Sequence, residues 1–478
     1  MEQLVSEEKC FRIEGDSIGT RELPKNAYYG VQTLRAVENF KITGLKTHKE
    51  FVRSLAQIKK ATAITNAEVG LMDKSIQNSI KKACDEIIDG KLYDQFITDP
   101  IQGGAGTSMN MNANEVIANR AIEILGGEKG DYSIVHPNDH VNMGQSTNDV
   151  IPTAGKITAL KLIPKAIKQL IKLHEVLVKK SEEFDEVIKM GRTQMQDAVP
   201  IRLGQEFAAY SAVVARDIKR LENAMESLKT VNMGATAIGT GINADKQYEN
   251  KIVPNLAKVT GMSLKQAENL VDGTQNVDCF VEVSSIIKTC AVSLSKMAND
   301  LRLMSSGPRT GFGEINLPPK QNGSSIMPGK VNPVIPEVVS QIAFNIVGND
   351  MTITMAAEAG QLELNAFEPV IFYNLFESIE TLANGVDTFI NNCIIGITAN
   401  KKRCQNLVEN SIGIVTVLCP YIGYKEAAKI AKTAMKTEEP IREIILKSGL
   451  LNEEKIDEVL DAMAMTEPGI TTKCLIAN

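Results

Sequence analysis

One stretch of the sequence combines the side chains best suited to chemistry: residues 323–337, which read GSSIMPGKVNPVIPE. It holds two serine hydroxyls and a single lysine amine, and its first acidic residue is Glu337. Glycine and proline are dense from about residue 311 to residue 331, which argues against a regular helix or strand there. A long loop of this kind is typical of a lid or a binding loop, although its serines equally suit an ordinary turn.

The end of this stretch has the pattern of a helix start. Asn332 suits the N-cap position and Pro333 suits the first helical position. Ser324, Ser325 and Lys330 then lie just ahead of a helix N-terminus, where the partial positive charge of the helix favours an anion. The stretch therefore predicts a loop that binds an anion.

Three further segments place small hydroxyl or amide side chains beside predicted helix starts. Helix capping alone explains any one of them. Acting together, they would line a neutral, donor-rich pocket for carboxylates, with the loop lysine as its cation. The side chains concerned are Thr107, the run Ser146, Thr147 and Asn148, and the pair Thr193 and Gln194.

The loop sequence GSSIMPGKVNP resembles the corresponding loop of the fumarase/aspartase superfamily. Three more segments resemble the other active-site segments of that superfamily, in the same order: GTSMNMNANE from residue 106, GQSTND from residue 144 and GRTQMQD from residue 191. The residues after the loop, VIPEVVSQIAFNIVGNDMTITMAAEAGQLELN, resemble the aspartate ammonia-lyase branch. The resemblance covers nearly the whole chain, and four segments in order are far more specific than one.

This resemblance implies an enzyme that reversibly eliminates ammonia from L-aspartate to give fumarate, and we expect no organic cofactor and no metal ion. It implies that Ser324 is the catalytic base and that the segments meet from different subunits of a homotetramer. Gln194 is a further candidate for the pocket. The residues to which the resemblance assigns binding of the two carboxylates and the amino group are Thr107, Ser146, Thr147, Asn148, Thr193, Ser325, Lys330 and Asn332.

The chemistry of such an elimination explains this choice of residues. Removing a proton from the carbon next to a carboxylate creates an enediolate with a second negative charge. Each donor aimed at its oxygens lowers the barrier by about 3 kcal/mol, and we expect Lys330 and Asn332 to serve that carboxylate. An alcohol is a weak base, so Ser324 needs to be an alkoxide, stabilised by backbone N–H groups and Lys330 when the loop closes and excludes water.

Other functions are less favoured by the residues. The main alternative is a fumarate hydratase, but Gln194 stands where the fumarase branch has histidine, and glutamine exchanges no proton near neutral pH. A non-catalytic relative, like the lens crystallins of this superfamily, does not need the intact loop. A nucleotide- or phosphate-binding scaffold lacks its P-loop or dinucleotide fingerprint. His136 and His140 have the spacing of a helical zinc pair, but Pro137 argues against a helix there.

The overall composition sets further bounds. A chain of 478 residues with 43% hydrophobic and 23% charged residues is typical of a soluble globular protein of two or three domains. The net charge of −6 argues against nucleic acid or an anionic membrane as the main partner. The eight cysteines form no CxxC motif, and we see neither a signal peptide nor a membrane-spanning run. We therefore expect a cytoplasmic enzyme with reduced thiols.

Long helices must position the candidate residues. Residues 274–306 contain no glycine or proline and are flanked by Gly273 and Gly307. Their apolar residues recur in alternating steps of three and four, as in a coiled coil. His174, on another such seam, is expected to be a hydrogen-bonded core histidine. The periodicity predicts helices over about 51–89, 107–125, 160–188, 205–233, 274–306, 334–358 and 370–395.

Helices of this length pack side by side in a bundle and leave apolar faces for other subunits. We therefore predict an all-α, three-domain subunit with a central bundle of long helices. The predicted domains are an N-terminal domain over 1–145, a central helical bundle domain over 146–400 and a small C-terminal helical domain over 401–478.

Overall fold

The computed structural model describes residues 11–469 of the chain. The first ten residues, which belong to the predicted signal-free N-terminus, lie outside the described residues, as do Cys10 and Cys474. The chain divides into two compact units. Unit 1 comprises the chain up to Ile167 together with Lys219–Thr289 and Phe344–Leu382, and unit 2 comprises Lys168–Ile218, Cys290–Ala343 and the chain from Ala383 onward.

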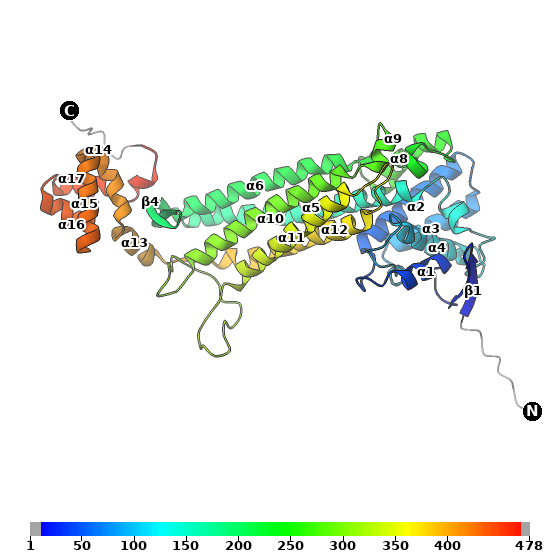
Figure 1. Cartoon of the computed structure of the whole chain (residues 1–478), viewed down its shortest axis with the longest axis horizontal. Helices are drawn as coiled ribbons and strands as arrows, with labels where there is room; N and C mark the ends of the chain where they lie inside the picture. Colours follow the sequence, from blue (N-terminus) through cyan, green and yellow to red (C-terminus); the bar gives the residue numbers. More distant parts are fainter. Residues whose placement is uncertain (1–10, 470–478) are drawn as a thin grey trace, which may run out of the picture. The chain divides into compact units, whose positions relative to one another are not determined.

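Long helices dominate both units (Figure 1). This confirms the predicted helical fold class with its long helices, and the ranges predicted for α10, α11 and α12 agree with the structure to within a few residues. The division into three domains stays a prediction. Five long helices each contribute one part to unit 1 and one part to unit 2: α5 (Thr147–Glu183), α6 (Leu203–Leu228), α10 (Asp278–Met304), α11 (Val334–Glu358) and α12 (Glu368–Asn392).

Unit 1 adds shorter elements to its parts of the long helices. One expectation was wrong here. The predicted helix over 51–89 is two helices, because Gly70 adopts a left-handed conformation and Asp73 caps a new helix. Residues 11–39 add a hairpin and a short helix. The elements are β1 (Phe11–Asp16), β2 (Gly19–Pro24), α1 (Val31–Asn39), α2 (Lys49–Glu68), α3 (Lys74–Ile88), α4 (Thr107–Ile124), β5 (Thr230–Val231), α7 (Thr236–Gly239), α8 (Lys246–Thr260), β6 (Lys265–Gln266) and α9 (Leu270–Gln275).

Close packing holds the long helices together within unit 1. The rings of Phe280 on α10 and Phe372 on α12 meet edge to face, with their centroids 5.0 Å apart. Gly155 on α5 lies so close to the Phe372 ring that a Cβ there would be 2.3 Å from it. Asp350 on α11 accepts a hydrogen bond of 2.8 Å from Ser284 on α10. These contacts join four long helices around one aromatic core.

Unit 2 contains the other ends of the long helices and the C-terminal helices. Ser295 on α10 bonds Ser340 on α11 at 3.3 Å. His174 on α5 contacts Ser211 on α6 at 2.8 Å, which confirms its predicted hydrogen bond, although the residue is half-buried and not fully in the core. The shorter elements are β3 (Ile188–Thr193) paired with β4 (Gln196–Arg202), β7 (Ile315–Asn316) paired with β8 (Thr398–Ala399), α13 (Lys401–Glu409), α14 (Cys419–Ile422), α15 (Tyr424–Thr437), α16 (Ile441–Ser448) and α17 (Glu453–Val459).

Within residues 11–469, no helix combines the length and the apolar character needed to cross a membrane.

Candidate active site

Ser146 begins α5 through a reciprocal pair of hydrogen bonds. Its Oγ accepts from the backbone N–H of Asn148 at 3.2 Å, and its own N–H donates to the carboxylate of Asp149 at 2.8 Å. This reciprocal pair resembles a capping box and caps the helix start that the sequence suggested. Burial raises the pKa of Asp149 to about 6, and the N–H groups of Ser146 and Gly234 partly offset that effect. Because Ser146 caps α5, the two predicted binding residues Thr147 and Asn148 lie in the first turn of this helix.

The N-terminus of α4 lies against the first turns of α5. A Cβ on Gly106, the N-cap of α4, would be 2.9 Å from the side chain of Ile151. Thr107 is the first residue of α4, and Asn110 one turn later donates its amide to Thr147 Oγ1 at 3.3 Å. Two helix N-termini thus converge in unit 1, which is a favourable place for a carboxylate.

Asn148 points to a different neighbour. Its Nδ2 donates to the carbonyl of Ala237 at 2.7 Å, and its own carbonyl accepts from Asn232 at 3.1 Å. Ala237 has a left-handed φ of 59°, which is strained for a residue with a Cβ. Strained residues of this kind are common next to ligand sites. The hydrogen bond from Asn148 to Ala237 joins the first turn of α5 to the α7 segment.

The structure corrects the environment of Thr193 and Gln194. They do not precede a helix but form the tip of the β3–β4 hairpin, where Thr193 pairs with Gln196. The two turn residues, Gln194 and Met195, both have positive φ angles, 54° and 66°. A two-residue hairpin of this type is normally built from asparagine and glycine, so the tip is strained, and all four of these residues are exposed.

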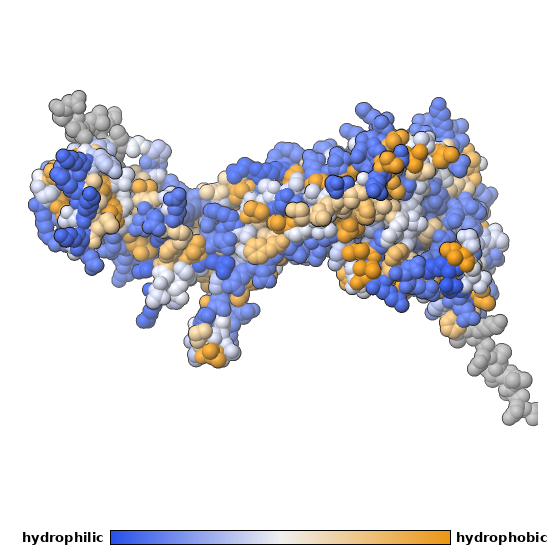
Figure 2. Space-filling model, viewed as in Figure 1, coloured by the Kyte–Doolittle hydropathy of each residue, from blue (hydrophilic) through white to orange (hydrophobic). Residues whose placement is uncertain are grey.

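The loop between α10 and α11 carries Ser324. The Ser324 Oγ accepts from two backbone N–H groups, those of Ile326 at 3.2 Å and Met327 at 3.1 Å. Ile326 and Met327 themselves are exposed, and the loop tip is apolar in Figure 2. Two N–H groups aimed at one hydroxyl oxygen favour the negatively charged form of that oxygen, which is the form that a serine base needs.

Asn332 closes the neck of this loop and does not cap α11, which corrects its predicted role as an N-cap. Its Nδ2 donates to the carbonyl of Gly323 at 2.8 Å, and the Gly323 N–H donates to the carbonyl of Lys330 at 2.8 Å. A Cβ on Gly323 would be 2.5 Å from that carbonyl oxygen, so only glycine fits there. The neck therefore places Ser324 and Lys330 at the same end of one small loop.

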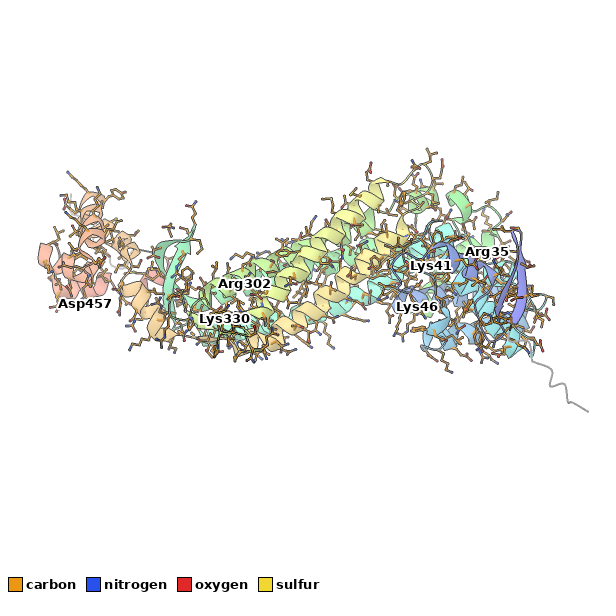
Figure 3. All side chains as sticks on the ribbon, turned by 60° about the horizontal axis from the view of Figure 1, so that its bottom comes forward. Arg35, Lys41, Lys46, Arg302, Lys330 and Asp457 are labelled. Carbon is orange, nitrogen blue, oxygen red and sulfur yellow. The ribbon has the colours of Figure 1, made fainter. Side chains whose placement is uncertain are left out.

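Lys330 and Asn332 line a cleft of about 790 Å³ with residues from the end of α10. The cleft includes Arg302, which lies near Lys330 in Figure 3. Arg302 is half-buried, and among the described residues its side chain bonds only Asn299, at 3.4 Å. No sequence pattern indicated Arg302, because its position on α10 has no motif that distinguishes it from a surface arginine. Two cations, Arg302 and Lys330, and one carboxylate, Glu337, line this cleft, so its charged lining is positive by one charge.

The root of the loop is held by buried ion pairs. Glu314 is fully buried, and its carboxylate lies 2.8 Å from the Arg192 guanidinium and 3.5 Å from the Lys189 amine. Lys189 also pairs with Glu206 at 2.9 Å. Arg192 directly precedes Thr193, so this network joins the base of the β3–β4 hairpin to the base of the Ser324 loop. One network of buried ion pairs therefore supports both predicted site segments of unit 2, the β3–β4 hairpin and the Ser324 loop.

Replacing Glu314 by glutamine should lower the free energy of unfolding by about 3 kcal/mol, because it leaves two buried cations with one carboxylate. Urea unfolding of the purified protein measures this. The matched control is Glu222→Gln, which removes one partner of an exposed pair with Lys219 at 3.4 Å and should cost no more than about 1 kcal/mol. Equal losses in the two variants would contradict a structural role for the Glu314 network.

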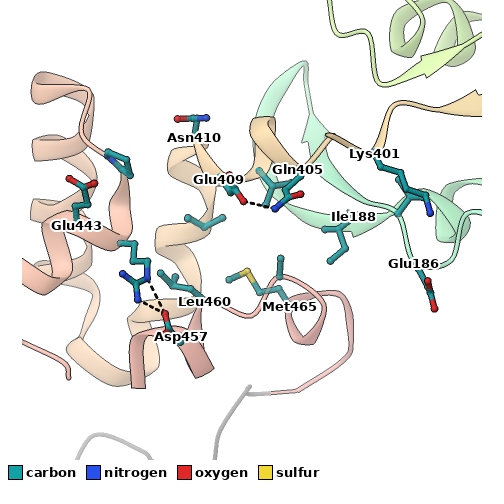
Figure 4. A pocket seen from close by; sticks show the side chains of 16 residues that line it. Glu186, Ile188, Lys401, Gln405, Glu409, Asn410, Glu443, Asp457, Leu460 and Met465 are labelled. Atoms are coloured by element: carbon teal, nitrogen blue, oxygen red, sulfur yellow. Dashed lines mark hydrogen bonds and ion pairs between the residues drawn. The ribbon is translucent and has the colours of Figure 1, made fainter. Parts of the chain in front are cut away.

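A second cleft, of about 740 Å³, lies among the C-terminal helices (Figure 4). Its arginine, Arg442, is already paired with Asp457 at 2.8 Å and with Glu453 at 3.1 Å. Glu409 and Glu443 add further negative charge to its lining. This cleft contains none of the predicted site residues and is a poor place for a dicarboxylate.

The structure thus brings the predicted residues together in two groups. Unit 1 holds Thr107, Ser146, Thr147 and Asn148 around the N-termini of α4 and α5. Unit 2 holds the exposed hairpin tip and the loop, with Thr193, Gln194, Ser324, Ser325, Lys330 and Asn332. His136 and His140 lie at a short π-helical turn over Pro137–Val141, which corrects the expectation that Pro137 prevents a helix there. The His136 N–H donates to His140 Nδ1 at 2.8 Å.

Comparisons with known proteins show the family to which the chain belongs. The chain matches the family described as Lyase over residues 19–348 and the family described as Fumarase C C-terminus over residues 414–467. It is 57% identical to an aspartate ammonia-lyase from Bacillus sp, covering 96% of this chain and 98% of the relative. It is 54% identical to the aspartate ammonia-lyase of Bacillus subtilis, covering 99% and 100%.

Among solved structures, a fumarate lyase:delta crystallin from Brucella melitensis matches with a TM-score of 0.93 at 49% identity, covering 96% of this chain and all of that one. Matches of this extent and identity leave no large part of the chain without a counterpart in these relatives. The chain therefore belongs to the fumarase/aspartase superfamily of lyases, in its aspartate ammonia-lyase branch.

Proposed function

We propose that this protein is an aspartate ammonia-lyase, a carbon–nitrogen lyase that converts L-aspartate reversibly into fumarate and ammonia. The observation that carries the proposal is the Ser324 hydroxyl, which accepts two backbone N–H groups on a loop that also presents Lys330. The names of relatives that are 54% and 57% identical over nearly their full length support the same substrate.

In the proposed reaction, the Ser324 alkoxide removes a proton from the carbon next to the β-carboxylate of aspartate. The electron pair of that C–H bond moves into the carboxylate and forms the enediolate. It then forms the C=C bond of fumarate while the C–N bond breaks and the amine leaves as ammonia. Lys330 and Asn332 bind the carboxylate that becomes the enediolate, where a charged donor stabilises the transition state more than the ground state.

The remaining donors hold the substrate in place. Thr107, Thr147 and Asn148 lie at the N-termini of α4 and α5, so their donors act together with two helix dipoles. The exposed hairpin tip with Thr193 and Gln194 is available to a neighbouring subunit. Ser146 and Ser325 complete the proposed set. Ammonia needs less acid assistance to leave than hydroxide does, which suits a site with glutamine at position 194.

A direct assay of ammonia released from L-aspartate tests the proposed function. Ultraviolet absorbance of fumarate, followed separately with L-aspartate and with L-malate, distinguishes it from fumarate hydratase, the second candidate. We expect fumarate from L-aspartate and none from L-malate. Fumarate formed only from L-malate would replace the proposal by the hydratase.

We propose a homotetramer in which the two groups of site residues meet across subunits. The support is an apolar stripe on α11, whose side chains recur every three or four residues and lie exposed on one helix face. Figure 2 shows apolar side chains gathered over this helix. The stripe consists of Phe344 (66% exposed), Val347, Met351 (61% exposed) and Met355 (65% exposed).

A double variant, Phe344→Glu with Met351→Glu, should break the assembly, because it places two charges in an interface that excludes water. Analytical ultracentrifugation should show particles smaller than a tetramer, and ammonia release should fall with the loss of assembly. Ile18→Glu is the control, because it adds a charge at another exposed apolar residue, 77% exposed in the β1–β2 turn. Intact, active tetramers of the double variant would contradict the proposed interface.

We also propose a cytoplasmic location. Cys84, Cys279, Cys393, Cys404 and Cys419 are free thiols in the described part of the chain. The first four of them are buried. Free thiols on this scale are typical of a reducing compartment.

A further inference from the structure

A polar cluster in unit 1 supports the segment that carries Ser146, Thr147 and Asn148. The cluster consists of one lysine from α2, two asparagines from α4 and two amides from the turn that precedes α5. We call it the Asn142 cluster, and its members are Lys59, Asn110, Asn114, Asn142 and Gln145. Lys59, Asn110 and Asn114 are at most 1% exposed. A lysine buried to this degree is rare unless the structure uses it.

Asn142 is the hub of this cluster. Its Oδ1 accepts three donors: Lys59 Nζ at 2.8 Å, Asn110 Nδ2 at 3.2 Å and Asn114 Nδ2 at 3.2 Å. Its Nδ2 donates to the carbonyl of Gln145 at 3.2 Å. One side chain therefore joins α2 and α4 to the turn just ahead of α5. A charged donor makes the strongest of these bonds.

Gln145 braces the same turn. Its Oε1 accepts a second hydrogen bond from Lys59 Nζ, at 2.9 Å. Its Nε2 donates to the carbonyl of Val141 at 3.0 Å and to that of Met143 at 3.2 Å. Lys59 thus holds both ends of the turn, and the residue that follows the turn is Ser146.

The cluster also reaches the proposed substrate-binding side chains directly. The amide of Asn110 that donates to Asn142 lies within 3.3 Å of Thr147 Oγ1 as well. A change at Asn142 would therefore alter both the backbone that leads into Ser146 and the amide that orients the Thr147 hydroxyl. A hydroxyl displaced by a few tenths of an ångström makes a weaker bond to a carboxylate.

We propose that Asn142 and Lys59 are positioning residues for substrate binding, which hold Ser146, Thr147 and Asn148 in the geometry that accepts a substrate carboxylate. This inference rests on the proposed function, since it assigns these three residues to the substrate. Neither Asn142 nor Lys59 needs to touch the substrate. Their effect is on affinity, so it should appear in KM more than in kcat.

The charge on Lys59 makes this support depend on pH. Burial lowers the pKa of the Lys59 amine to about 7, and the charge of Asp149 on α5 partly offsets this, as does Cys84 on α3 to a smaller extent. Below that pH the ammonium supplies its full set of donors to Asn142 and Gln145. As the pH rises through that value, the amine loses its charge and its bonds weaken. KM for L-aspartate should therefore rise on the alkaline side.

Two variants of Asn142 and one matched control test the inference by steady-state kinetics of ammonia release across pH. Asn142→Ala should raise KM about tenfold, the loss of a hydrogen bond to a charged group, with kcat changed less than about threefold. Asn142→Asp keeps the shape but places a carboxylate on Lys59. The carboxylate should raise the pKa of Lys59, so the rise in KM should occur at a pH that is higher by about one unit or more. Loss of packing alone would not shift the pH of this rise.

The matched control is Asn255→Ala. Asn255 is also a buried amide that joins two helices, since it donates from α8 to Thr65 at 3.0 Å and to Glu68 at 2.9 Å on α2. Its variant should lose stability but keep the KM of the parent protein. If the parent protein is active, two results would overturn the inference. They are an unchanged KM in Asn142→Ala, and a rise of KM with pH in Asn142→Asp that occurs at the same pH as in the parent. A parent protein that releases no ammonia from L-aspartate would overturn the proposed function itself.

Discussion

Ser324→Ala lowers kcat for ammonia release from L-aspartate by about 10²–10⁴-fold, the contribution expected from a positioned base. The variant keeps the loop and its backbone N–H groups but removes the oxygen to which those groups are directed. Stopped-flow or steady-state absorbance of fumarate measures the loss. Thermal unfolding and the oligomeric state should match the parent protein, because Ser324 is half-exposed and, within residues 11–469, its side chain bonds only its own loop.

Fumarate binding supplies the control for this variant. Isothermal titration should give a dissociation constant within a few-fold of the parent value, since the carboxylate donors are retained. Near-normal kcat in Ser324→Ala would remove this serine as the base. The base would then have to be sought among the other residues of the loop.

The second large effect is expected from Lys330→Ala. Removing the cation from the carboxylate that becomes the enediolate should lower kcat/KM by about 10²–10³-fold, or about 3 kcal/mol of transition-state stabilisation. Lys330 is exposed and forms no ion pair with any residue the structure describes, so its loss should leave the free energy of unfolding unchanged. Kinetics with L-aspartate and urea unfolding measure the two quantities.

Lys320→Ala is the matched control, because Lys320 is an exposed lysine of the same loop but lies outside the cleft around Lys330. It should leave kcat/KM unchanged. If Lys330→Ala altered stability alone, or if both lysine variants lost activity equally, a specific carboxylate contact by Lys330 would be contradicted.

Much of the architecture follows from local sequence patterns. The α11 range agrees with the prediction at both ends because a dense glycine and proline stretch ends where a long apolar repeat begins. Ser146 was predicted at a helix start, and it caps α5 because the acid three residues later, Asp149, completes the capping box. These features depend on neighbours within one or two turns, which is the range over which sequence patterns act.

Features that depend on distant residues were predicted wrongly or missed. Thr193 lies on a hairpin and not at a helix start, because its strand pairs with β4 and because Arg192 is held by Glu314, 122 positions away. The side-chain amide of Asn332 donates to the loop neck and does not cap the helix that follows it. The proposed roles of Arg302 and Lys59 depend on groups from other parts of the chain. Arg302 lines the cleft beside Lys330, and Lys59 donates to Asn142 and Gln145. No local pattern distinguishes them from ordinary surface cations.

The long helices, the loop that carries Ser324 and the chemical character of the donors were predictable from the residues, because periodicity, capping and composition are local properties of the chain. Which of these donors lie together depends on the folded chain: the N-termini of α4 and α5 meet in unit 1, and the hairpin and loop share the Glu314 network in unit 2. Burial explains this difference. A lysine or glutamate far from water must find partners wherever the fold brings them, and those partners come from other parts of the chain.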